Sequence, residues 1–182
     1  MATVRLTPAG VYSVVDLEKV SAELTGNGIF QEFGLDKTEF ANKLFENGQL
    51  AIIDNNKKTI KVPTAIGDKV YLHASVAKTY KEGAGRETYA VTAKDKTYLP
   101  RLFALVATDV IATNAVTFDT TDFADLNAAK VAIKAGTAVV VPQAGADWKL
   151  VKVAGATGAS VIGDVEWTVL SNDREGVRIR IR

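Results

Sequence analysis

The sequence of 182 residues contains no cysteine, which excludes disulfide bonds, thiolate zinc sites and cysteine nucleophiles. Its single histidine, His73, removes most histidine-based metal and acid–base sites as well. Neither sign of charge dominates, because 22 lysines and arginines face 21 aspartates and glutamates. This balance argues against a nucleic-acid partner. We therefore expect no cofactor, no bound metal and no nucleic acid.

Long apolar runs are also missing. The longest, residues 102–107 and 137–141, are far shorter than the roughly 20 residues of a membrane-spanning helix. Residues 1–8 do not lead from a basic stretch into an apolar run, so we expect no secretory signal peptide. With 47% hydrophobic and 24% charged residues, the composition is that of a globular chain without a membrane partner.

The N-terminal third carries two helix-like patterns. Ser13 is placed to cap a helix that ends near Gly26. Its apolar face would consist of Val14, Leu17, Val20 and Leu24, which are spaced three or four residues apart. Asp36 followed by Glu39 resembles a capping box. The apolar stripe that follows, Phe40, Leu44 and Phe45, predicts a second helix.

Strand patterns follow. Residues 50–53 and 59–62 predict a hairpin. Beyond Pro63, short alternating or β-branched stretches separated by turn residues predict seven or eight strands. These stretches are residues 69–76, 87–93, 102–107, 110–118, 137–141, 148–153, 164–170 and 177–181. Residues 122–134 predict a short helix with Asp122 as its N-cap.

The sequence thus predicts an α+β fold that is mainly β. An N-terminal helix–helix–hairpin segment is expected over residues 1–62. An antiparallel β-sandwich or partly open barrel is expected over residues 63–182.

Few residues form a pattern that would indicate catalysis. His73 and Ser75 fall on the same face of a predicted strand, with their positions about 7 Å apart by pleat geometry. A serine nucleophile needs its base within roughly 3 Å. The sequence therefore favours a partly exposed strand histidine over a catalytic pair.

Carboxylates and glycines offer weaker patterns. Asp119, Asp122 and Asp125 are spaced by three residues and could present oxygen ligands to a cation. Capping of a helix by Asp122 is the simpler interpretation. Residues 54–56 could also bind a cation, but a simple turn is the favoured interpretation there. Residues 83–85 and 155–158 resemble fragments of phosphate loops, but both lack the spacing and setting of one, which favours loop tips.

The C-terminus has the clearest pattern. Residues 177–182 alternate, so that one face is Val and Ile and the other carries Arg178, Arg180 and Arg182. This row could form an interface with a protein partner or contact phosphates. It could also be solvated or paired within the chain, for which the available carboxylates are Asp164, Glu166, Asp173 and Glu175. Trp148 and Trp167 lie in strand patterns and are expected in the core or beneath a loop.

Three segments, residues 80–85, 96–105 and 115–119, resemble those of virion structural proteins of tailed bacteriophages. The resemblance is one of texture over residues 64–182: strands rich in Ala, Val and Thr, Gly-rich loops, no Cys, and almost no His or Met. It is nearest to small head-decoration, or cement, proteins. It implies a non-enzymatic protein present in many copies in the virion, bound to the major capsid protein or other virion subunits.

Other functions stay open at this stage. The chain could be a head–tail or tail protein. It could instead be a carbohydrate-binding or adhesin-like module, with Tyr71, Tyr80, Tyr89 or Tyr98 stacking on sugars. An enzyme that uses a carboxylate pair, such as a glycosidase, is the least favoured class, because no such pair can be singled out.

Overall fold

The computed structural model describes residues 2–9, 11–16, 29–75, 90–93, 99–170 and 173–182. This part of the chain is mainly β, as the sequence predicted, with one α-helix, α1 (Leu126–Lys134), and a 3-10 turn, η2 (Val153–Ala156). The strands are β1 (Thr3–Arg5), β2 (Ile29–Phe30), β3 (Gly34–Leu35), β4 (Phe45–Glu46), β5 (Leu50–Asp54), β6 (Thr59–Lys61), β7 (Tyr71–His73), β8 (Ala90–Val91), β9 (Leu102–Ala104), β10 (Val110–Thr113), β11 (Val116–Asp119), β12 (Ala138–Val141), β13 (Trp148–Lys152), β14 (Gly163–Val169) and β15 (Glu175–Ile181).

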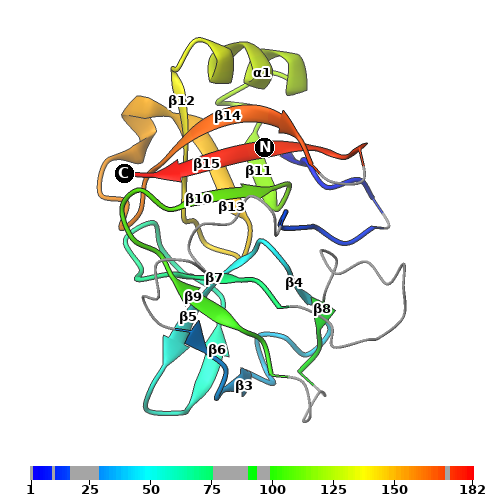
Figure 1. Cartoon of the computed structure of the whole chain (residues 1–182), viewed down its shortest axis with the longest axis vertical. Helices are drawn as coiled ribbons and strands as arrows, with labels where there is room; N and C mark the ends of the chain where they lie inside the picture. The colour runs from blue at the N-terminus through cyan, green and yellow to red at the C-terminus, as the bar shows by residue number, and fades with distance from the viewer. Residues whose placement is uncertain (1, 10, 17–28, 76–89, 94–98, 171–172) are drawn as a thin grey trace.

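Seven strands form the larger sheet, in the order β1-β11-β13-β12-β14-β15-β10. It occupies the upper half of Figure 1, with α1 above β12 and β14. Only two residues separate β10 from β11, although these strands lie towards opposite ends of the order. Because the three steps from Thr113 to Val116 span at most about 11 Å, the sheet must curl until its ends approach each other. It stays open, so it is a curled sheet rather than a closed barrel.

The N-terminal residues occupy both edges of this curled sheet. β1 pairs with β11 at one edge, and Val15 forms a bridge with Thr113 of β10 at the other. Between them, Leu6 donates its N–H to the carbonyl of Val116. The described residues between Thr3 and Val15 thus lie along the seam between the two ends of the sheet.

A central strand shows why the apolar stretches fold as they do. All four residues of β12, Ala-Val-Val-Val, are buried. Ala138 and Val140 join the main core, whereas Val139 and Val141 pack outward against a smaller cluster that includes Ala156. A strand covered on both faces needs a continuous apolar run, which is what the sequence supplies at residues 138–141.

Six further strands form a second sheet, in the order β2-β9-β7-β5-β6-β3, which lies in the lower half of Figure 1. The predicted hairpin of β5 and β6 is confirmed, with Ile53 opposite Ile60. β4 and β8 make a separate two-stranded pair. β5 also pairs with β7, so strands from either side of residue 62 are neighbours in one sheet. The division of the chain at that residue stays a prediction.

The main core joins the two sheets and the helix. Its members are buried side chains from the curled sheet, α1, β5, β7 and β9. The largest fully buried side chains among them are Trp148, Phe118, Phe103, Leu50, Leu72, Ile111, Leu150 and Ile179. Trp148 is fully buried, as predicted, and its indole N–H donates to the carbonyl of Gly48.

The predicted helix after Asp36 does not form. The Asp36 carboxylate does accept hydrogen bonds from the amides of Thr38 and Glu39, as a cap would. The Glu39 carboxylate, however, accepts from the Val62 amide, and the Asp36 amide donates to Ile60. Residues 37–42 stay a turn and Phe45 enters β4. Hydrogen bonds to Ile60 and Val62 thus take the place of those that a helix would supply.

The first predicted helix is wrong over residues 13–16, and the rest of it lies outside the described residues. Ser13 donates its amide and hydroxyl to the Glu46 carboxylate. Val14 donates to the side chain of Asn114, and Asp16 donates to the carbonyl of Ala112. With their amides bonded across the fold, these residues are extended.

Strand bounds and directions also differ from expectation. The predicted strand 110–118 is interrupted at Asn114, whose backbone carbonyl and side chain bind Thr7 and Val14. The predicted strand 69–76 is reduced to β7 within its described residues. The sheets are not purely antiparallel, because β11 runs parallel to β13 and β3 parallel to β6.

The helix at residues 126–134 is confirmed, but its cap is not. Asp125, rather than Asp122, is the N-cap, and its carboxylate accepts the amide of Ala128 at 2.8 Å. Asp122 lies in the turn before it, with its amide bonded to the carbonyl of Asp119. At the other end, Gly136 adopts a φ of 68°, which suits glycine at a helix terminus.

Candidate functional site

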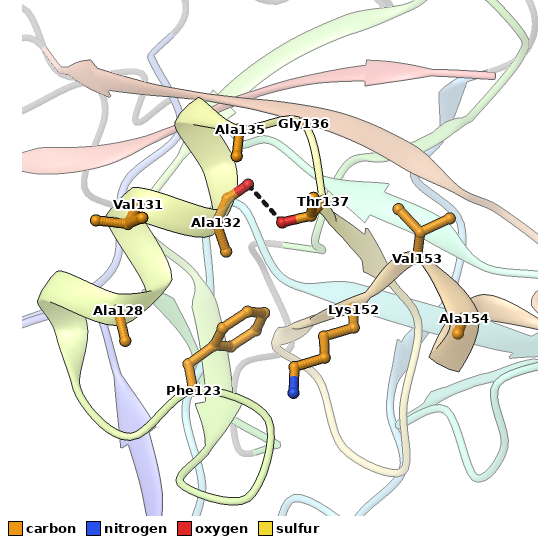
Figure 2. A pocket seen from close by; sticks show the side chains of 10 residues that line it. All are labelled: Phe123, Ala128, Val131, Ala132, Ala135, Gly136, Thr137, Lys152, Val153 and Ala154. Carbon is orange, nitrogen blue, oxygen red and sulfur yellow. Dashed lines mark hydrogen bonds between the residues drawn. The ribbon is translucent and has the colours of Figure 1, made fainter.

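A groove of about 680 Å³ lies between α1 and η2. Figure 2 shows its two walls, the helix on one side and the end of β13 with η2 on the other, with Phe123 between them. Nearly all of the lining is small and apolar. The residues are Phe123, Ala128, Val131, Ala132, Ala135, Gly136, Thr137, Lys152, Val153 and Ala154.

The groove exists because α1 carries apolar residues on two sides. Ala129 and Ile133 face the core and are buried. Val131 falls on the opposite side of the helix and is 68% exposed, and Val153 across the groove is 44% exposed. The extra valine off the buried stripe was visible in the sequence, and it was the available signal for this surface. Contiguous exposed apolar surface of this kind marks interaction sites.

Polar groups in the groove are few. The Thr137 hydroxyl donates to the carbonyl of Ala132 at 3.1 Å, so it is already used by the helix end (Figure 2). Lys152 is exposed, and no carboxylate in the described segments pairs with it. The lining has no carboxylate and no imidazole. This arrangement suits the binding of apolar surface, with one cation at the side.

The second surface is the outer face of β14 and β15. The alternation of β15 is confirmed: Val177, Ile179 and Ile181 are buried, while its arginines are exposed. β15 is an inner strand between β14 and β10. Across the β14–β15 pair, Asp164 lies opposite Arg180, and Glu166 lies opposite Arg178.

Only some of the arginines on this face form ion pairs with carboxylates of β14. Arg182 donates two hydrogen bonds to Asp164 Oδ1, at 2.9 and 2.6 Å, and this contact raises the pKa of its guanidinium. Arg178 lies 3.9 Å from Glu166. Arg180 has no ion-pair partner in the described part of the chain. Pairing with β14, one of the alternatives that the sequence left open, is therefore observed for two of the three arginines.

The other carboxylates proposed for the arginine row have different positions. Glu175 pairs with Lys130 of α1 at 2.6 Å. Lys130 also lies over the ring of Trp167, 4.5 Å from its centroid. Asp173 lies in the turn between β14 and β15, with a φ of 56°. Together, Lys130 and Trp167 attach the helix to the β14–β15 hairpin on the inner face.

His73 and Ser75 are brought together, contrary to the estimate from strand geometry. β7 ends at His73, and the Ser75 hydroxyl oxygen lies 2.9 Å from His73 Nε2. Both residues are buried, so the expectation of a partly exposed histidine is wrong. The carbonyl of Glu46 lies 2.8 Å from Nδ1. Because a carbonyl only accepts, Nδ1 carries the proton and Ser75 donates to Nε2.

This cluster resembles a serine–base pair in its bonds, but its surroundings are those of a core. His73 stacks on Phe45 with ring centroids 4.3 Å apart. Burial lowers the pKa of His73 to about 4, although the Glu46 carbonyl acts in the opposite direction. The Ser75 oxygen also accepts the Arg101 amide. A neutral, fully enclosed histidine whose two nitrogens are both bonded fixes β7 against β4.

The three spaced aspartates serve separate structural roles. Asp119 binds Lys149 at 2.7 Å and accepts from Thr3, and the Lys149 ammonium holds its pKa below the usual value. Asp125 caps α1, and Asp122 is in the turn. Across the described segments, no three His, Asp or Glu side chains are grouped so that they could hold a metal ion.

Other sequence candidates resolve in the same way. Asp54 accepts the amides of Asn56 and Lys57 and pairs with Lys61, so the hairpin turn uses its carboxylate. Residues 155–158 lie in and just after η2, without a strand–loop–helix setting. Residues 83–85 lie outside the described residues, and so do three of the four tyrosines considered for sugar stacking, at positions 80, 89 and 98. Tyr71 is half-buried in β7.

One polar network was missed by the sequence. Arg5 of β1 binds Glu46 at 2.7 Å and Asp147 at 2.8 Å. Asp147 also accepts from Gln49 at 2.7 Å. Burial raises the pKa of Glu46, but hydrogen bonds from Ser13 and Arg5 outweigh it and hold that pKa below its usual value. The members of this network are far apart in the chain, so no local sequence pattern predicts it.

Comparison of the chain with family models, curated proteins and solved structures finds no match. Within the described segments, no helix combines the length and apolarity needed to cross a membrane. The geometry of these surfaces is therefore the basis for a functional proposal.

Proposed function

We propose that the chain is a non-enzymatic structural protein of a virion, which binds coat subunits on the outside of a tailed-phage capsid and stabilises the shell. The groove between α1 and η2 is the observation that supports a role in protein contacts. Its occupant is an apolar segment of the major capsid protein. The resemblance of residues 64–182 to head-decoration proteins is the ground for choosing a capsid as the assembly.

The physical argument rests on the exposure of valine. Val131 and Val153 keep much of their surface in water, at a cost of about 25 cal/mol for each Å² that a partner could cover. A helix gains nothing in its own stability from such a residue on its outer side, since β-branched residues are weak helix formers. Covering both valines would supply a central apolar contact of the kind that dominates protein interfaces.

The decisive experiment begins with particles purified from the source culture, in which the copy number of this chain is measured by quantitative mass spectrometry. Hundreds of copies per particle are expected for a decoration protein. A dozen or fewer would instead indicate a neck or tail component. Complete absence from particles would overturn the proposal and favour the binding-module alternative.

A binding assay then tests the groove. Shells that lack this protein are mixed with the purified chain and sedimented, and the bound fraction is measured. Val131→Glu should weaken binding at least about tenfold, because it would place an unpaired carboxylate in a buried contact. Val169→Glu is the matched control, since Val169 is 55% exposed and lies on β14 outside the groove. Equal binding by both variants would exclude the groove as the contact.

A further inference from the structure

The outer face of the β14–β15 hairpin carries two parallel rows of opposite charge. Asp164 and Glu166 form the acidic row on β14, and Arg178 and Arg180 form the basic row on β15. All four side chains are exposed. A shallow depression of about 140 Å³ lies among them, with Val165. β14 and β15 lie side by side across the middle of Figure 1.

We propose that this face binds the same face of a second copy of the chain, about a two-fold axis that runs parallel to the two strands. Rotation about such an axis exchanges the positions of β14 and β15 and leaves the height along the strands unchanged. It therefore sets Asp164 against the second copy's Arg180, and Glu166 against the second copy's Arg178. Each contact occurs twice, as in any isologous interface.

The charge pattern selects this axis over the alternative. A two-fold axis across the strands would set β14 against β14 and β15 against β15. Carboxylates would then face carboxylates and guanidiniums would face guanidiniums, which is unfavourable. Of the two in-plane two-fold axes that keep the strands of both copies aligned, only the axis along the strands joins unlike charges.

The side chains have the reach and the free groups that the contact needs. Stacked sheets lie about 10 Å apart, a gap that one long arginine and one short carboxylate can span together. Arg180 has no ion-pair partner in the described residues, and Arg182 binds only Oδ1 of Asp164. Asp164 Oδ2 can therefore accept a guanidinium from the second copy. Glu166 is held only loosely, at 3.9 Å from Arg178.

The contact is narrow, since it involves the outside of two strands of a curled sheet. Exposed ion pairs are individually weak and are screened by salt. Free in solution the pairing is therefore a weak, salt-sensitive equilibrium. Where copies are held close together by another attachment, the same contact acts at a high effective concentration.

Sedimentation equilibrium of the full chain, over a wide concentration range at low and high salt, tests the proposal. A monomer–dimer equilibrium is expected at about 20 mM salt, weakened at least tenfold at about 500 mM. The double variant Arg178→Glu/Arg180→Glu should stay monomeric, and so should Asp164→Lys/Glu166→Lys. An equimolar mixture of the two variants should form a heterodimer, because each supplies the charges that the other then needs.

The matched control is Lys43→Glu/Lys57→Glu, which makes the same change in net charge at two exposed lysines outside the hairpin. It should associate as the unchanged protein does, and circular dichroism should show that all variants fold. A protein that stays monomeric at low salt would overturn the proposal. So would an association that the arginine variant retains, or a variant mixture that forms no heterodimer.

Discussion

His73 Nε2 lies 2.9 Å from the hydroxyl oxygen of Ser75, and both groups are buried where β7 ends. The imidazole is neutral in this position, because burial lowers its pKa to about 4 from 6.5. An unfolded chain would take up a proton on the same group at higher pH. The pair therefore links the stability of the fold to pH in the weakly acidic range.

We expect the free energy of unfolding to fall as pH drops from 6.5 towards 4. In that window the unfolded state binds a proton at His73 that the folded state excludes, so stability is greatest above pH 6.5. The loss from this residue approaches about 3 kcal/mol at pH 4. Urea unfolding at several pH values measures this loss. In the His73→Gln variant, the contribution of His73 to the change of the free energy of unfolding with pH should disappear.

The titration itself can be observed directly, since the chain has one histidine. Its imidazole proton resonance in the folded state should stay in the neutral position down to about pH 5. A midpoint near 6.5 would contradict the buried, Ser75-bonded position.

Glu46→Gln should destabilise the fold by about 2 kcal/mol. The carboxylate accepts from Arg5 and from both donors of Ser13, and its charge holds Arg5 at this position together with that of Asp147. Since the pKa of Glu46 is depressed in the folded state, its stabilisation is present above the unfolded pKa and is lost as pH falls through the folded one. Glu166→Gln, at an exposed carboxylate, is the control and should change stability by less than about 0.5 kcal/mol. Chemical denaturation at pH 7 compares the two.

Gly163→Ala should destabilise the protein by about 1–3 kcal/mol. A Cβ at this position would overlap the side chain of Ile179 and lie 2.9 Å from Cγ2 of Val140. Gly155→Ala is the matched control, because its Cβ would meet only Val151, at an ordinary 3.5 Å. Thermal unfolding of both variants decides the matter; an equal effect would mean that β14 does not pass this close to β15 and β12.

Asp125→Ala should lower the free energy of unfolding by about 1 kcal/mol. For a chain of this size, this corresponds to a fall in Tm of about 2–4 °C. It removes the carboxylate that accepts the Ala128 amide at the start of α1. Asp122→Ala, the cap that the sequence predicted, should have almost no effect. A larger effect at Asp122 than at Asp125 would restore the sequence-based assignment.

These two aspartates show which part of the fold could be predicted from the sequence. The helix at residues 126–134 and the alternation of β15 were predicted, because each is specified by a local period of apolar residues. The start of the helix was misplaced by one turn, since either aspartate could cap it equally well by local chemistry. The tertiary fold made the choice.

The Asp36–Glu39 pair shows where local patterns fail. The cap hydrogen bonds formed, but the amide of Asp36 and the carboxylate of Glu39 found partners at residues 60 and 62 instead of within a helix. The Arg5 network and the approach of Ser75 to His73 depend on residues that only the folded chain brings together. No periodicity encodes such contacts, so the polar part of the structure could not be predicted.

The segment along the seam of the curled sheet has a consequence for the order of folding. β1 needs β11, and Val15 needs β10, which in turn pairs with β15 near the end of the chain. On the ribosome, β1 and Val15 must therefore wait for partners that emerge much later. The six-stranded sheet lies wholly between residues 29 and 104 and can assemble in the meantime. Synthesis thus runs opposite to assembly for β1, which is made well before β11 and can pair only after β11 has emerged.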